Sequence, residues 1–322
     1  MKRLAALSGI ILSLISISVF ADSFEDGFYY LDKTQIEKAW TITGGSKDVK
    51  IGMISTGANY KLDSLRQNID LNTDEISANG IDDDHNGYVD DVFGINTNNK
   101  TSDPMDYHGI GSFITGLVGG THRGMLKNTS MVLANPLNDQ GGGDFTSVIE
   151  AIQYVVSRGA KIIDLGVGPT APDLCETIAS FKTRGILFVS TAGNGGYDLD
   201  PVSARCVSDN MLVVATSDEK DQLAFYSNWG KLSVHVAAPG TNISGYNHLD
   251  KQITWSGGSF STAIVSAIAA LALSINPTLA YQDLIDVIVN GVDVIPALQN
   301  KVMAGGRVNA YNTVRLARSF HP

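Results

Sequence analysis

An acidic segment in the first third of the chain has oxygen donors at a spacing that suits a metal ion. They occur at alternate positions around Gly87: Asp82, Asp84, Asn86, the Tyr88 carbonyl and Asp90. This spacing matches positions 1, 3, 5, 7 and 9 of a calcium loop, although Phe93 occupies position 12, where an EF-hand has its glutamate. A solvated acidic turn is the alternative. Because carboxylates at this spacing would otherwise repel one another, the sequence favours a structural calcium ion that orders the loop.

The chain has two cysteines, Cys175 and Cys206. In an oxidising compartment, such a pair predicts one disulfide. The bond would be a structural staple, because the two residues lack the C-x-x-C spacing of a redox site. Two buried free thiols are the alternative.

Short apolar runs alternate with segments of helical spacing after the first twenty residues. The runs that we predict as buried strands are 49–54, 131–133, 161–165, 186–190 and 211–215. Helical spacing occurs at 147–156 and 172–183. This alternation predicts an α/β fold with a mostly parallel sheet and helices on both faces. Functional side chains are then expected at the carboxyl ends of the strands. We predict one domain from residue 22 to residue 322, in which 70–102 is the one long irregular segment.

The N-terminus has the pattern of a secretory signal peptide over residues 1–21. Lys2 and Arg3 precede an apolar run at 4–20, and Val-Phe-Ala at 19–21 has the form of a cleavage site. A membrane anchor is the alternative, although the run is short for a span and contains serines. The signal predicts export, either to a periplasm or out of the cell, and no membrane contact after cleavage.

The formal net charge is −10. A nucleic-acid-binding protein needs a basic face, so this charge argues against such a function. It also argues against binding to an anionic membrane surface.

A series of segments, in their order along the chain, resembles the signature segments of the subtilase family of serine proteases. Ile-Ser-Thr-Gly resembles the family's Asp-Thr-Gly strand end, and Ser-Gly-Gly-Ser-Phe-Ser-Thr resembles the segment around its nucleophile. The segments are 54–57, 106–116, 192–194, 227–230, 238–240, 256–262 and 305–310. The resemblance implies a subtilisin-like three-layer fold. It also implies an acyl-transfer site in which a His base activates a Ser nucleophile and an Asp orients the His.

The resemblance places the nucleophile at Ser259, where we predict the start of a helix over 259–274, and the oxyanion donor at Asn194. A helix N-cap is the alternative role for Ser259. In the same register, Ser55 occupies the position of the Asp and Ile110 the position of the His. Isoleucine accepts no proton, and a serine hydroxyl supplies no charge to stabilise an imidazolium. In subtilisin, loss of the His alone lowers turnover by about 10⁶-fold.

His108 lies two residues before Ile110 and is the candidate for a displaced base. An exposed turn histidine is the alternative, because a base must come within hydrogen-bond distance of the nucleophile. Residues 22–48 leave no room for the inhibitory propeptide that secreted subtilases usually carry, so we expect none.

These residues lead to two hypotheses. The first is an exported, monomeric pseudoprotease that binds a peptide or protein in the former substrate cleft. The second is an active serine-type endopeptidase in which Ser259 works with a rearranged base. The missing base favours the first hypothesis, because it is the largest single loss in this mechanism.

Overall fold

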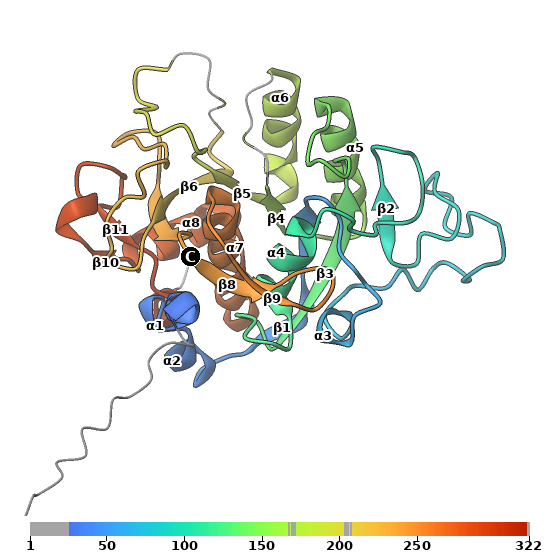
Figure 1. Ribbon diagram of the computed structural model, residues 1–322, viewed down its shortest axis with the longest axis horizontal. Helices are drawn as coiled ribbons and strands as arrows, with labels where there is room; N and C mark the ends of the chain where they lie inside the picture. Colours follow the sequence, from blue (N-terminus) through green and yellow to red (C-terminus); the bar gives the residue numbers. More distant parts are fainter. Residues whose placement is uncertain (1–25, 167, 169–171, 203–205, 207, 321–322) are drawn as a thin grey trace, which may run out of the picture.

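A mixed but mostly parallel sheet lies at the centre of the computed structural model, which describes residues 26–320 apart from 167, 169–171, 203–205 and 207 (Figure 1). The predicted signal peptide lies outside the described residues. The strands are β1 (Gly45–Ile54), β2 (Gly94–Asn96), β3 (Asn128–Asn135), β4 (Ile162–Leu165), β5 (Leu187–Thr191), β6 (Met211–Ser217), β7 (Val236–Pro239), β8 (Ile243–Tyr246), β9 (Gln252–Trp255), β10 (Asp293–Val294) and β11 (Gly306–Arg307). The nine-stranded sheet has the order β10-β11-β7-β6-β5-β4-β1-β3-β2, and β8 and β9 form a separate antiparallel hairpin.

All neighbouring strands of the large sheet run parallel except β10 and β11 at one edge. The helices are α1 (Tyr29–Lys33), α2 (Ile36–Trp40), α3 (Asp63–Arg66), α4 (Ile110–Gly119), α5 (Phe145–Ser157), α6 (Pro172–Ser180), α7 (Gly258–Ile275), α8 (Tyr281–Asn290) and α9 (Ala310–Ser319). Consecutive strand residues point to opposite faces. In β4, for example, Ile162 belongs to the core cluster that includes residues of α4, α7 and α9, whereas Ile163 belongs to the cluster that includes residues of α5 and α6. The predicted three-layer α/β fold is therefore confirmed.

The predicted strands and helices correspond to observed elements, although several bounds differ: β1 begins at Gly45 rather than at residue 49, and β3 extends beyond 131–133 at both ends. The helix predicted over 172–183 ends as α6 at Ser180 and continues as a 3-10 turn, Phe181–Arg184. Gly185 closes this turn with a φ of 69°, a left-handed conformation that glycine adopts without strain.

Helices pack on both faces of the sheet, and a glycine of β1 allows the close approach of α5. A Cβ at Gly52 of β1 would lie 2.5 Å from Val155 Cγ2 of α5. On the other face, α7 is the one described helix long and apolar enough to cross a membrane, but most of it is buried in the core. It belongs to the core cluster that also contains residues of β1, β5, β6 and β7.

Candidate active site

Ser259 is the second residue of α7, and the start of this helix lies against the end of β5. A Cβ at Gly258 would lie 2.1 Å from Thr191 Oγ1, so only glycine allows the two elements to meet here. Ser259 is half-buried, and its Oγ has no hydrogen-bond partner within the described chain. The hydroxyl is thus not used as a helix cap: α7 has no side-chain cap hydrogen bond. It is available for chemistry or for binding.

Asn194 lies beside Ser259, in the loop that follows β5. Its Oδ1 accepts a hydrogen bond of 3.0 Å from the backbone N–H of Gly258. This bond fixes the amide group next to the start of α7, and the side chain is exposed. The amide N–H₂ group therefore remains as a donor at the surface next to Ser259, which suits an oxyanion or a peptide carbonyl.

Ser55 directly follows β1 and is buried. Its neighbour Thr56 joins β1 to the start of α4: Thr56 Oγ1 donates to Asp106 Oδ1 (2.9 Å) and accepts from the backbone N–H of Gly111 (2.9 Å). Asp106 Oδ2 accepts from the backbone N–H of Ser112 (2.7 Å). The buried Asp106 carboxylate thus holds the first turn of α4, although it lies outside the three triad positions.

Ile110 is the first residue of α4 and is half-buried. It packs against the core cluster that contains Phe113 and Phe260, whose ring centroids lie 4.9 Å apart. Trp255, at the end of β9, packs against the same cluster, with its ring 5.6 Å from that of Phe113. The predicted base position therefore has an apolar side chain that packs against the core.

The candidate displaced base, His108, lies near Trp255 and Gly141. Its ring lies 6.5 Å from that of Trp255, and its Nε2 faces Gly141, where an added Cβ would be 3.5 Å away. No hydrogen bond joins His108 to Ser259 among the described residues. Sequence reasoning gave no role to His248, yet its Nδ1 would lie only 2.6 Å from a Cβ at Gly109. Neither Nδ1 has a hydrogen-bond partner in the described part of the chain.

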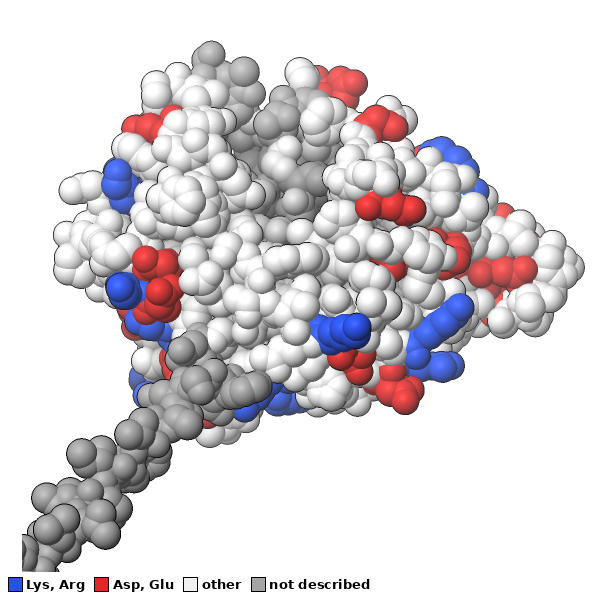
Figure 2. All heavy atoms as spheres, viewed as in Figure 1, with Lys and Arg blue, Asp and Glu red and all other residues white. Residues whose placement is uncertain are grey.

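A cavity of about 320 Å³ opens beside Asn194, behind the end of β5. The described residues that line it include Tyr197, Leu199, Val202 and Met211, and none is charged. Figure 2 shows that the surface over β8, β9 and the start of α4 also carries few charged side chains. This arrangement suits an uncharged side chain of a bound segment.

The predicted disulfide between Cys175 and Cys206 is present, with Cα atoms 5.4 Å apart. It joins α6 to the segment before β6, and Cys206 also lines the cavity beside Asn194. The loop that carries Asn194 lies between the two cysteines in sequence.

The acidic loop brings together part of the predicted ligand set and one residue that the spacing missed. Ligand atoms of Glu75, Asp82 and Asp84 all lie within 4.8 Å of one another, and Glu75 is buried. Asp90 instead accepts hydrogen bonds from the backbone N–H groups of residues 79 and 80, each at 3.0 Å. Asn86 Nδ2 donates to Asp84 Oδ2 (2.9 Å).

Within this loop, Tyr88 directs its hydroxyl to Glu150 of α5. Burial raises the pKa of the Tyr88 phenol above its usual range, and the hydrogen bond to Glu150 raises it further.

Glu75, the acid that the spacing missed, follows no alternating pattern in the sequence, so only the folded loop reveals it.

One buried carboxyl group lies outside both sites. Asp164 of β4 is fully buried on the α7 side of the sheet, where Ser266 Oγ donates to its Oδ2 (2.7 Å). Its Oδ1 has no partner in the described structure. Burial raises the pKa of Asp164 from 3.8 to about 7, and the hydrogen bond from Ser266 opposes the shift only in part.

Comparison with known proteins defines the class to which this fold and site belong. The sequence profile described as the subtilase family matches residues 46–310. The chain therefore belongs to the subtilase family.

Named relatives are proteases of this family. Subtilisin-like protease 1 of Plasmodium berghei (strain Anka) is 28% identical over 94% of this chain and 56% of its own length. The halolysin-like extracellular serine protease Nep of Natrialba magadii is 30% identical over 80% of this chain and 46% of its own length. The chain thus spans about half the length of the curated relatives that it matches.

Two solved structures share the fold. One, from work on the assembly of the subtilase cytotoxin SubAB, has a TM-score of 0.72 at 21% identity and covers 90% of this chain and 96% of its own. A cold-adapted subtilisin-like serine proteinase has a TM-score of 0.63 at 24% identity, with 81% of this chain and 86% of its own covered. The subtilisin-like architecture predicted from the sequence is confirmed.

Proposed function

We propose that this subtilase is an exported pseudoprotease that binds a peptide or protein segment in its former substrate cleft. The observation that carries the proposal is Ile110, which the family register places at the base position and which packs against the main core cluster. Without a proton acceptor there, the hydroxyl of Ser259 is a poor nucleophile. The exposed amide of Asn194 and the uncharged cavity beside it remain suited to hold a peptide carbonyl and its side chain.

A fluorophosphonate probe tests the proposal, because it reacts with activated serines. The purified full chain, its Ser259→Ala variant and an active subtilase are treated side by side, with circular dichroism to show that both chains are folded. We expect no labelling of the folded wild-type chain above that of the variant. Labelling that disappears in Ser259→Ala would show an activated serine and would overturn the pseudoprotease.

An active serine-type endopeptidase is the second candidate function, and the placement of Asn194 beside Ser259 favours it. Its base would have to be a histidine that moves on substrate binding. His108 lies two residues before Ile110, and His248 lies against Gly109, so both are candidates. If the probe labels Ser259, the His108→Ala and His248→Ala variants identify the base by loss of labelling. Retention of labelling in both variants would exclude the two histidines.

We further propose that the acidic loop binds a structural calcium ion through Glu75, Asp82 and Asp84. These groups fit the ion chemically, because calcium prefers carboxylate oxygens and Glu75 is a buried acid directed toward two others. When bound, the ion would neutralise the cluster and order the loop. The chain's own contribution is the set of loop N–H groups that already orient Glu75: those of Asp83 and Asp84 donate to its Oε1 at 2.9 and 3.1 Å.

Export to a periplasm or out of the cell remains part of the proposal. The signal-like N-terminus and a relative named as extracellular support it. Fractionation of cells that express the full chain tests it, since retention of the uncleaved chain in the cytoplasm would contradict export.

A further inference from the structure

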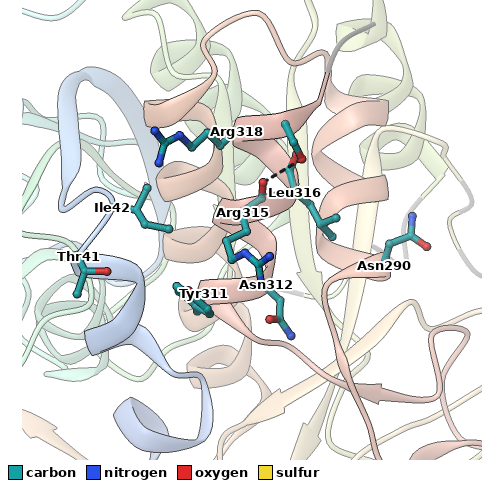
Figure 3. Close-up of a pocket in the computed structure, with 9 residues that line it drawn as sticks. Thr41, Ile42, Asn290, Tyr311, Asn312, Arg315, Leu316 and Arg318 are labelled. Carbon is teal, nitrogen blue, oxygen red and sulfur yellow. Dashed lines mark hydrogen bonds between the residues drawn. The ribbon is translucent and has the colours of Figure 1, made fainter.

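A second cavity lies on the outer side of α9, at the far end of the core helix from the cleft (Figure 3). Its volume is about 740 Å³, and its lining comes from α9, the end of α8 and the segment after α2. Ser259 lies at the start of α7, which has 18 residues and is therefore about 27 Å long. Just beyond its other end, Asn276 Nδ2 donates to the backbone carbonyls of Ala317 (3.0 Å) and Phe320 (3.1 Å). We call this cavity the α9 pocket.

Two arginines line the α9 pocket without acidic partners. Arg315 and Arg318 lie one turn apart on α9 and are exposed, and neither forms an ion pair with a described residue. By contrast, Arg158 and Arg307 pair with aspartates. No Asp or Glu of the described chain lines the pocket, although acidic residues outnumber basic ones in the full sequence. Two cations at this helical spacing repel one another, so a counter-charge from outside the chain would stabilise them.

The remaining side chains of the pocket are donors and apolar groups. Tyr311 holds Arg315 by a cation–π contact, with Cζ 5.6 Å from the ring centroid. Figure 3 shows Arg315 next to Asn312, whose amide is a further donor, and Ile42 below the guanidinium of Arg318. The pocket therefore offers positive charge and hydrogen-bond donors beside an aromatic and an aliphatic wall.

We propose that the α9 pocket binds a phosphate monoester, with the phosphate on Arg315 and Arg318 and the organic group against Tyr311 and Ile42. A phosphate monoester carries close to two negative charges at neutral pH, which balances the two guanidinium groups. Guanidinium groups also match phosphate oxygens in pairs of charge-assisted hydrogen bonds. Two kinds of ligand carry such a phosphate group: a free phosphate ester and an anionic phospholipid with the phosphate in its headgroup.

Calorimetric titration of the full chain with phenyl phosphate at low ionic strength tests the proposal. We expect saturable binding that weakens as salt is added. Arg315→Ala/Arg318→Ala should weaken it by about tenfold or more, because both charge-assisted contacts are lost. The Arg315→Lys/Arg318→Lys variant keeps the charge without the guanidinium geometry. Its affinity should lie between that of the wild type and that of the double alanine variant. Arg66→Ala removes an exposed arginine from α3 and is the matched control, with affinity unchanged.

Several results would overturn the site. They are the absence of binding by the wild-type chain, unchanged affinity in the double alanine variant, and an equal loss in Arg66→Ala. An equal loss in Arg66→Ala would show that surface arginines attract anions in general, without a specific site. Thermal melts of each variant exclude unfolding as the cause of a loss. Co-sedimentation with phosphatidylcholine vesicles, with and without phosphatidic acid, distinguishes the sources: arginine-dependent sedimentation supports a lipid headgroup, and its absence alongside phenyl phosphate binding supports a free ester.

Discussion

Replacement of Asp164 by Asn should change the pH dependence of stability more than any other single substitution in the core. Asp164 is buried in the middle of β4, with one oxygen bonded to Ser266 and the other without a partner among the described residues. No charged group contributes to the shift of its pKa, which arises from burial. The cost of ionising this carboxyl is therefore not offset by a salt bridge.

The magnitude follows from the two pKa values. The pKa of Asp164 is about 7 in the folded chain and 3.8 in its ordinary state. Below pH 3.8 both states hold the proton, and the group has no net effect. Between the two values the unfolded chain loses the proton first, so the free energy of unfolding falls as pH rises. Above pH 7 the full loss is about 4 kcal/mol, at 1.36 kcal/mol for each pKa unit.

Urea unfolding of wild type and Asp164→Asn from pH 4 to pH 8.5 measures this loss. Asn has the same shape, accepts the bond from Ser266 and stays neutral. We expect similar stability at pH 4 and an advantage for the variant of about 4 kcal/mol at pH 8.5. Asp139→Asn, at an exposed loop position, is the matched control and should follow the wild type.

Taking the difference between the two curves removes the titration of all other groups. If Asp164→Asn ran parallel to wild type across the whole range, Asp164 would have an ordinary pKa in the folded state and the reasoning from burial would be wrong. A Ser266→Ala variant gives an independent check. Its loss of stability should be larger at pH 8.5 than at pH 4, because the hydroxyl stabilises the ionised form.

Three further variants test the other features. Calcium at about a hundredfold above its dissociation constant should raise the free energy of unfolding by about 2.7 kcal/mol, and Glu75→Gln should remove most of this increase in melts with calcium or EDTA. An equal calcium effect in the variant would place the ion elsewhere. Cys175→Ser/Cys206→Ser should lower the free energy of unfolding by about 3–4 kcal/mol in denaturant titrations, since the bond spans 31 residues; an unchanged midpoint would contradict this. Ser55→Asp/Ile110→His should restore part of the turnover that falls by roughly 10⁶-fold without a base. The restored activity would be measured as peptide hydrolysis, which a further Ser259→Ala change should abolish. A folded but inert double variant would show that the cleft has diverged beyond its triad.

Most of the fold follows from local sequence patterns. The apolar run of β4 and the helical periodicity of α5 are strong signals, because both elements are buried against apolar neighbours in the core. The end of α6 was less predictable, because helical spacing continues to residue 183 and only the left-handed Gly185 terminates the turn. The short strands β10 and β11 have two residues each, too few to produce any period.

Short motifs located two residues of the candidate site that the fold brings together from distant parts of the chain. Asn194 and Ser259 come from compact motifs, and the structure places the amide and the start of α7 in contact. The acidic loop was predicted less well, because spacing assumes one regular ligand loop. In the fold, Asp90 turns back to bond with backbone N–H groups, and Glu75 enters from an earlier turn. Such a contact depends on the path of the whole loop and leaves no periodic signal.

The features that preserve the shape of this site are separate from the groups that would perform catalysis. Gly258 is required by the close approach of α7 to Thr191, and the bond from its N–H orients Asn194. Asp106 and Thr56 hold the start of α4 with a network that needs neither an acid at Ser55 nor a base at Ile110.

Neither Ser55 nor Ile110 is therefore needed to hold the start of α4. Packing explains Gly258 of the nucleophile motif, whereas the Ser259 hydroxyl has no partner within the described chain and suits binding as well as chemistry. The nucleophile motif is thus weak support for proteolysis, and the residue at position 110, which the network at the start of α4 does not require, is the more informative observation about function.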